Sequence, residues 1–181
     1  YQGMPCVGHV SSPDLRNWTH HEPIFISEAY TRDNQGFVEF EVPEIFELAG
    51  KHYLVFSSIR SRKSFTSGRE DAAGTWYLVA DRKEGPYTVP KSPLLMGTGM
   101  GRIDHYVGRT ITRNGQRLMY CQNWGPYTGV NWSTPKLVRA DALNELSLEY
   151  WPELDGLKQE RLFSAASLRV KSDADKRYQI H

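Results

Sequence analysis

The chain has 181 residues, of which 39% are hydrophobic and 24% are charged, so it can build a packed core and wholesale disorder is not expected. Its net charge is +1 and its Lys and Arg residues are scattered, which argues against nucleic-acid and anionic-membrane partners. No apolar stretch approaches the roughly 18 residues that span a bilayer.

The two cysteines, Cys6 and Cys121, cannot form a disulfide scaffold, and no metal-ligand spacing is present. We expect both to be buried thiols. This favours a cytoplasmic over a secreted location without deciding between them. No signal peptide is visible, but the chain starts at Tyr1 without Met, so we expect residues to precede it and draw no conclusion about targeting.

The elements predicted along the chain are almost all strands, because short aromatic and β-branched runs alternate with turn residues. The Asn114-Gly115 pair between two such runs is a strong hairpin signal. Helical periodicity is short and weak, and is confined to residues 140–148. The expected strands cover residues 6–11, 19–25, 40–48, 51–58, 75–80, 87–95, 105–112, 117–124, 135–141 and 146–151.

These strands form repeating four-strand units with an offset of about 65 residues, as in the blades of a β-propeller. One unit starts near residue 40 and the next near residue 105, and the first two strands supply half a unit more. We therefore predict an all-β fold, a partial five-bladed β-propeller with about two and a half blades. We expect residues 1–157 to be its C-terminal blades, with the remaining blades supplied by a missing N-terminal part of the chain. Residues 158–181 are expected to form an exit linker and the start of a following strand or sandwich.

Several short motifs resemble those of sugar-cleaving five-bladed propellers. Residues 12–18, SPDLRNW, are similar to an S-x-D-L-x-x-W signature, and residues 40–46, FEVPEIF, resemble the W-E-C-P-D-L-F segment of glycoside hydrolase family 32. The segment retains Glu41 and Pro43, and it departs from the family pattern at Phe40, Val42, Glu44 and Ile45. Residues 104–109, 116–124 and 137–152 resemble later blocks of the same family.

The resemblance implies an enzyme that cleaves fructosyl glycosides of the sucrose or fructan type by a retaining mechanism without a cofactor. The related family 43 (arabinanases and xylosidases) shares the fold, and its E-G-P acid motif is also compatible with Glu41-Val42-Pro43. An arabinan- or xylan-type glycosidase and a non-catalytic carbohydrate-binding propeller therefore stay open as alternatives. The W-M-N-D-P-N-G motif that holds the family 32 nucleophile does not occur in these residues, so we expect the nucleophile to lie outside them. An R-D-P motif is also absent, and Arg32-Asp33-Asn34 resembles it only superficially.

Glu41 is the candidate catalytic acid, since glycoside cleavage needs one carboxyl group that protonates the leaving oxygen and a second that attacks or activates water. Its sequence neighbours are apolar, which would favour the protonated form that an acid needs. Pro43 is expected to restrict Val42 to extended geometry. The competing interpretation is a solvated strand carboxylate, because Glu39 and Glu41 alternate on one strand face. Glu39 is the second choice for the acid and a candidate substrate contact.

Three further residues are candidate substrate contacts. Asp104 is either a ligand of a sugar hydroxyl, a modulator of the acid's pKa, or a turn residue. Tyr106 either hydrogen-bonds the sugar or packs in the core, and Trp124 either stacks on a sugar face or is buried. His9, His20 and His21 lack partners at metal-ligand spacing, so no metal site is predicted.

Overall fold

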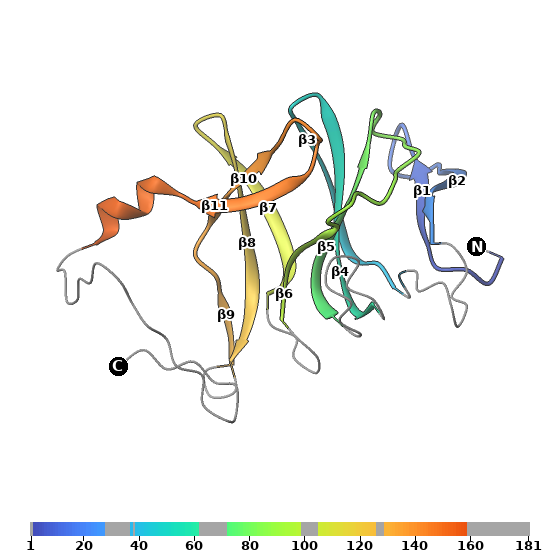
Figure 1. Cartoon of the computed structure of the whole chain (residues 1–181). Coiled ribbons are helices and arrows are strands. Elements are labelled where there is room, and N and C mark those ends of the chain that lie inside the picture. Colours follow the sequence, from blue (N-terminus) through green and yellow to red (C-terminus); the bar gives the residue numbers. More distant parts are fainter. Residues whose placement is uncertain are drawn as a thin grey trace. The chain divides into compact units, whose positions relative to one another are not determined.

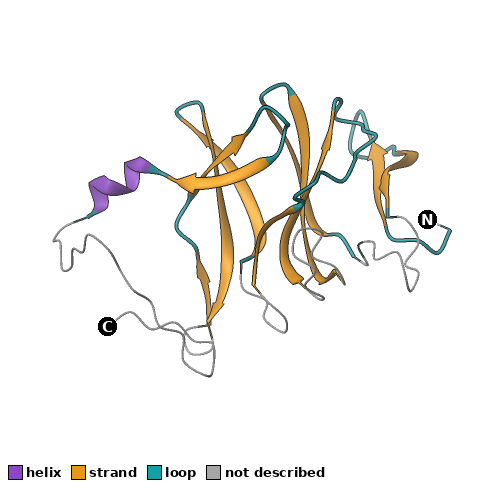
Figure 2. Ribbon diagram, viewed as in Figure 1, coloured by secondary structure: helices purple, strands orange, loops and turns teal. Residues whose placement is uncertain are grey.

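The computed structural model describes residues 2–27, 37, 39–61, 72–98, 105–125 and 129–158, and within these the fold is nearly all-β (Figures 1 and 2). A two-stranded sheet contains β1 (Cys6–Ser11) and β2 (Thr19–Ile26). The first complete blade is the sheet β3 (Glu41–Leu48), β4 (Lys51–Ser61), β5 (Ala72–Ala80) and β6 (Leu94–Thr98). The second complete blade is β7 (Tyr106–Arg113), β8 (Gln116–Gly125), β10 (Lys136–Ala140) and β11 (Leu146–Tyr150), with β9 (Gly129–Trp132) also paired to β8. The predicted all-β partial propeller with two and a half blades is confirmed.

The structure corrects one predicted strand and adds a strand that was not predicted. The fourth strand of the first complete blade was expected at residues 87–95, but only Thr88 bridges to Val79 there, and β6 begins at Leu94. Pro90 and Pro93 explain the interruption, since proline has no N–H to donate to a sheet ladder. The strand β9 was not expected. The weak helical pattern over residues 140–148 is not a helix, because the turn between β10 and β11 and most of β11 occupy this segment.

The chain divides into two compact units, Tyr1–Trp151 and Pro152–His181. All three sheets lie in the first unit. The second unit is described only over its first residues, where the 3-10 helix η1 spans Pro152–Leu157. The domain boundary expected after residue 157 stays a prediction, and residues 159–181, with the strand expected among them, lie outside the described residues.

The SPDLRNW motif is the turn between β1 and β2. The carboxylate of Asp14 accepts hydrogen bonds from the backbone N–H of Arg16 (2.9 Å) and of Asn17 (2.8 Å). These backbone bonds, with those from the Asn17 and Ser12 side chains, lower the pKa of Asp14 to about 2. Leu15 has a left-handed φ of 61°. The motif therefore fixes a hairpin turn, and its Asp serves the backbone.

The core consists of two clusters of buried side chains. In the first, Phe37 makes edge contacts with Phe56 (ring centroids 4.8 Å apart) and with Trp76 (5.4 Å), and Val7 and Ile24 join the two-stranded sheet to this cluster. The second cluster lies between the two complete blades and includes, from the one blade, Phe46, Tyr53, Val55 and Tyr77, and, from the other, Met119, Val138 and Leu146. Burial of apolar area at roughly 25 cal/mol per Å² holds the blades face to face.

The cysteine prediction is correct for one residue of the two. Cys121 is fully buried, which raises the pKa of its thiol, whereas Cys6 is only half-buried. Both are free thiols.

The two complete blades repeat the same hairpin at an offset of 65 residues. The turn between β7 and β8 contains Asn114 (φ 50°) and Gly115 (φ 73°), as expected from their sequence. The turn between β3 and β4 contains Ala49 (φ 51°) and Gly50 (φ 75°) at the corresponding positions. Two consecutive left-handed residues are what a type I′ turn requires, so the same turn sets the register of both hairpins.

Candidate functional site

The candidate site begins at a bulge in β3. Glu41 pairs with Ser57 and Glu44 pairs with Val55, so three steps along β3 match two along β4. The extra residue bends the strand and re-aims the side chains beside it. Glu41 lies directly before this bulge, at the first position of β3.

The backbone of the bulge corrects one sequence prediction. Pro43 was expected to hold Val42 in extended geometry, but Val42 has a left-handed φ of 48°. This region costs an L-residue roughly 1–2 kcal/mol, and β-branched residues rarely occupy it. Residues in such conformations cluster at active sites, where the surrounding structure holds them.

A second bulge of the same kind lies in β7. Tyr106 pairs with Gln122 and Arg109 pairs with Tyr120, and Val107 inside the bulge has a φ of 55°. Each residue of this bulge lies 65 positions after its counterpart in β3, as 106 follows 41 and 109 follows 44. The repeat therefore places Tyr106 at the position in its blade that Glu41 occupies in the preceding one.

The two equivalent side chains meet. The hydroxyl of Tyr106 donates a hydrogen bond to Glu41 Oε2 over 2.6 Å, although the residues are 65 positions apart. Tyr106 is buried, with 5% of its surface exposed. Burial first, then the hydrogen bond to Glu41 and the negative charges of Glu41 and Glu39, raise the pKa of Tyr106 above its ordinary value of 10. The phenol therefore keeps its proton and remains a donor throughout the neutral pH range.

The surroundings of Glu41 differ from those expected. Its apolar sequence neighbours Phe37 and Phe40 turn into the core beside Phe56, and the side chain of Glu41 itself is exposed. The predicted apolar enclosure is therefore absent among the described residues. Glu39 is half-buried and near enough to Tyr106 for its charge to act on the phenol.

The backbone on both sides of Tyr106 is anchored to the first complete blade. The N–H of Val107 donates to Ser57 Oγ (2.8 Å), and the N–H of Gly108 donates to Thr75 Oγ1 (3.2 Å). Thr75 Oγ1 in turn donates to the carbonyl of His105 (3.1 Å). Ser57 and Thr75 are fully buried, so these hydroxyls replace solvent as partners for the bulge backbone.

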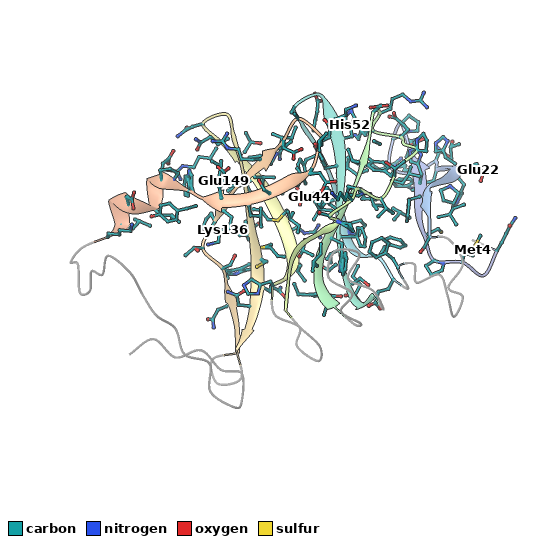
Figure 3. All side chains as sticks on the ribbon, viewed as in Figure 1. Met4, Glu22, Glu44, His52, Lys136 and Glu149 are labelled. Atoms are coloured by element: carbon teal, nitrogen blue, oxygen red, sulfur yellow. The ribbon has the colours of Figure 1, made fainter. Side chains whose placement is uncertain are left out.

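A further group of contacts joins the ends of the two bulges. The carboxylate of Glu44 accepts hydrogen bonds from the backbone N–H of Thr110 (3.0 Å) and from Thr110 Oγ1 (2.5 Å). Arg109 Nη1 donates to the carbonyl of Val42 over 2.7 Å. Figure 3 labels Glu44 between the sheet that contains β3 and the sheet that contains β7. We call these contacts, together with those of Ser57 and Thr75, the interblade seam.

The other predicted site residues stand as follows. Asp104 lies outside the described residues, as do Arg32, Asp33 and Asn34. Trp124 belongs to β8, but its side chain is not among those described. The remaining two are placed: Tyr106 contacts Glu41, and Glu39 lies near Tyr106. His105, which was not singled out, has a left-handed φ of 57° and a buried Nδ1 without a hydrogen-bond partner among the described residues.

Within the described ranges, no three His, Cys, Asp or Glu side chains gather in a way that would hold a metal ion. The same residues contain no helix with the length and apolar character needed to cross a membrane. Among the described residues, the candidate site comprises a carboxylate, a phenol that donates to it, and the bulged backbone that holds both.

Sequence reasoning missed the seam residues Ser57, Thr75, Arg109 and Glu44. Two features of the sequence could have pointed to this region. One was the 65-residue offset, which aligns Glu41 with Tyr106 and Glu44 with Arg109. A second was the E-G-P form of the acid motif. Its glycine stands where Val42 adopts a positive φ, and glycine is the residue that takes this conformation without steric cost.

Comparison with known families gives one sequence match. The model of glycosyl hydrolases family 43 matches residues 1–146, most of the chain and all of the site described above. No curated protein matches the sequence.

Among solved structures, the chain is similar to an exo-1,5-alpha-L-arabinanase from a bovine ruminal metagenomic library, with a TM-score of 0.54 and 16% identity over 77% of this chain and 48% of that one. It is also similar to Bacillus subtilis levansucrase, with a TM-score of 0.58 and 14% identity over 79% of this chain and 33% of that one. A B. megaterium levansucrase variant gives a TM-score of 0.55 and 19% identity over the same shares. The chain thus spans about half the length of the arabinanase and a third of that of the levansucrases. At these identities the likeness shows the fold.

Proposed function

The chain belongs to glycosyl hydrolases family 43, and from this premise we propose that the protein cleaves glycosidic bonds with Glu41 as its general acid. The observation that carries the proposal is the hydrogen bond from Tyr106 to Glu41 Oε2. If Glu41 were simply a solvated strand carboxylate, a hydrogen bond from a buried phenol would not be expected. Glu41 receives a 2.6 Å hydrogen bond from the equivalent position of the next blade.

The proposed role of Glu41 is to protonate the oxygen of the leaving group as the glycosidic bond breaks. Tyr106 donates to Oε2, which leaves Oε1 as the oxygen free to carry the proton toward the substrate. An exposed side chain at the start of β3 is accessible to a sugar. The second carboxylate that the chemistry needs is proposed to lie outside the described residues.

The substrate class that family membership favours is the arabinan or xylan type. This reverses the order expected from the sequence motifs, which put sucrose- and fructan-type substrates first. Family 32 itself is not supported by the family match, since the matching model is that of family 43. One argument still favours a fructosyl substrate, namely the resemblance of FEVPEIF to the acid segment of family 32. Fructosyl substrates are therefore included in the test below.

Retention or inversion at the anomeric carbon depends on the separation of the two carboxyl groups, about 5 Å for retention and roughly 6.5–9.5 Å for inversion. The retaining mechanism expected from the sequence is a prediction that the configuration of the first sugar released would decide. NMR of the reaction mixture within the first minutes reads that configuration directly.

The test is sugar release by the full-length protein, wild type against Glu41→Gln, on arabinan, xylan, sucrose, inulin and levan. Loss of a general acid lowers the rate by about 100-fold or more on natural substrates. Glu47→Gln is the matched control, because Glu47 is an exposed carboxylate on the same strand, beyond the bulge. Its activity should equal that of the wild type.

Three outcomes separate the readings. Release from arabinan or xylan that Glu41→Gln abolishes supports the proposal as stated. Release of fructose that the same substitution abolishes keeps the acid and changes the substrate class. Binding of sugar without release by the wild type would overturn the proposal in favour of a carbohydrate-binding propeller.

A further inference from the structure

The carbonyl of Val42 is the point at which the strained bulge is held from outside its own blade. Val42 has a left-handed φ of 48°, and Pro43 after it offers no backbone N–H. Pairing with β4 resumes only at Glu44. The segment between Glu41 and Glu44 thus depends on contacts from elsewhere to keep this conformation.

Arg109 supplies these contacts from β7. Its Nη1 donates to the carbonyl of Val42 over 2.7 Å and, more weakly, to that of Pro43 over 3.4 Å. The same nitrogen lies 3.9 Å from Glu44 Oε2, whose carboxylate is fixed by Thr110. Only about a third of the Arg109 side chain is exposed. A guanidinium presents several N–H groups in one plane, which suits it to neighbouring acceptors of this kind.

We infer that Arg109 is a positioning residue for Glu41, which acts by holding the Val42 carbonyl and thereby the direction in which the Glu41 side chain leaves the strand. The inference rests on the proposed function, since it assigns a partner to the same acid. Arg109 makes its contacts with the backbone after Glu41 and with Glu44. It therefore differs from Tyr106, which holds the carboxylate itself.

The dependence of kcat/KM on the leaving group distinguishes a misplaced general acid from a loss of stability. A leaving group with a high pKa needs a proton as the bond breaks, whereas a dinitrophenolate leaves without one. Misplacing the acid should therefore lower kcat/KM for an alkyl glycoside and spare a dinitrophenyl glycoside of the same sugar. A partly unfolded or generally disturbed enzyme would lose activity on both substrates alike.

The variant is Arg109→Met in the full-length protein, which keeps an unbranched apolar stem and removes the N–H donors. We expect kcat/KM for the alkyl glycoside to fall about 10-fold or more, on the scale of a small displacement of a catalytic group, with a change of less than about 3-fold for the dinitrophenyl glycoside. Arg139→Met is the matched control, since Arg139 forms an exposed ion pair with Glu149 in the outer strands of the second complete blade. It should match the wild type on both substrates.

Glu41→Gln in the same assay separates the two claims. If Glu41→Gln itself shows no dependence on the leaving group, the proposed function fails. If Glu41→Gln shows this dependence but Arg109→Met lowers kcat/KM equally for both substrates, or for neither, then Arg109 has no positioning role. The assignment of Glu41 as the general acid is unaffected by that result. Should Arg109→Met not fold, Arg109→Lys is judged by the same ratio of kcat/KM for the two substrates, because lysine keeps the charge but its shorter side chain does not reach the position of Nη1, through which Arg109 makes its contacts.

Discussion

The bulges of β3 and β7 are the same kind of backbone irregularity, but they carry different side chains. Both insert one residue into the strand and hold a valine at positive φ, Val42 in one and Val107 in the other. At the position before the valine, one blade presents an exposed carboxylate and the next presents a buried phenol that donates to it. In the proposed function, one blade supplies the general acid and the next blade supplies the phenol that donates a hydrogen bond to it.

The two bulges also differ in what holds them. The β7 bulge is held through its backbone N–H groups by the buried hydroxyls of Ser57 and Thr75. The β3 bulge is held through the carbonyl of Val42 by Arg109. Each blade thus stabilises the strained segment of the other, which couples the geometry of the site to the packing of the seam.

Among substitutions within the two bulges and their contacts, the largest loss of stability is expected from Gly108→Ala, which disturbs the contact between the β7 bulge and Thr75. A Cβ at this position would lie 2.5 Å from Thr75 Cγ2 and 2.9 Å from Thr75 Oγ1, inside a fully buried contact. Overpacking of this kind costs about 1–3 kcal/mol. Urea unfolding should show the loss, and Gly115→Ala is the contrast, since open space surrounds Gly115 and only its φ of 73° resists the substitution. Equal stability of Gly108→Ala and the wild type would mean that the blades do not approach as described.

Tyr106→Phe is expected to come next, because it removes the hydrogen bond to Glu41 and keeps the ring. We expect about a 10-fold loss of kcat/KM on substrates with poor leaving groups, the scale of one lost hydrogen bond to a charged group. The pH dependence has a defined sign. Since burial and the nearby carboxylates raise the pKa of Tyr106, the neutral phenol supports the folded state below pH 10, and this support is lost only as the pH rises further.

A loss of activity in Tyr106→Phe that appears only above pH 10 would contradict this assignment, because the donor would then be dispensable at neutral pH. Tyr87→Phe is a suitable control. Tyr87 is also buried, and burial raises its pKa to about 12, but its hydroxyl donates to the carbonyl of Lys83, away from the bulges. It should leave the leaving-group dependence of kcat/KM unchanged.

The smallest effect is expected from glycine at the two strained valines. Val42→Gly and Val107→Gly relieve the left-handed strain and lose side-chain contacts and chain stiffness, so each should change the free energy of unfolding by no more than about 1 kcal/mol. Val55→Gly, at a fully buried position paired with Tyr77, should cost several times more. A loss at Val42 as large as that at Val55 would show that its φ is not left-handed.

Much of the fold followed from local signals. The Asn114-Gly115 turn and the aromatic run of β4 gave the hairpins and their strands, because turn chemistry and apolar runs act over a few residues. The motif also named Glu41 as the candidate acid, a role that stays a proposal. Tyr106 was itself a candidate substrate contact, but its hydrogen bond to Glu41 was not predicted, because the contact spans 65 positions and depends on the packing of two sheets. The rule for residues before proline gave the wrong geometry at Val42, where the bulge and Arg109 outweigh the local preference.

The central claim is that Tyr106 and Glu41 act as one unit in which the phenol serves the acid. A double-mutant cycle of kcat/KM on an alkyl glycoside, with Glu41→Gln, Tyr106→Phe and the double variant in the full-length protein, tests it most directly. We expect Tyr106→Phe to cost about 10-fold in the wild-type background. It should cost almost nothing once Glu41 is replaced by Gln, because the carboxamide can still accept the hydrogen bond but has no acidic proton for the phenol to help deliver. An equal cost in both backgrounds would contradict the claim and make Tyr106 a contributor independent of Glu41.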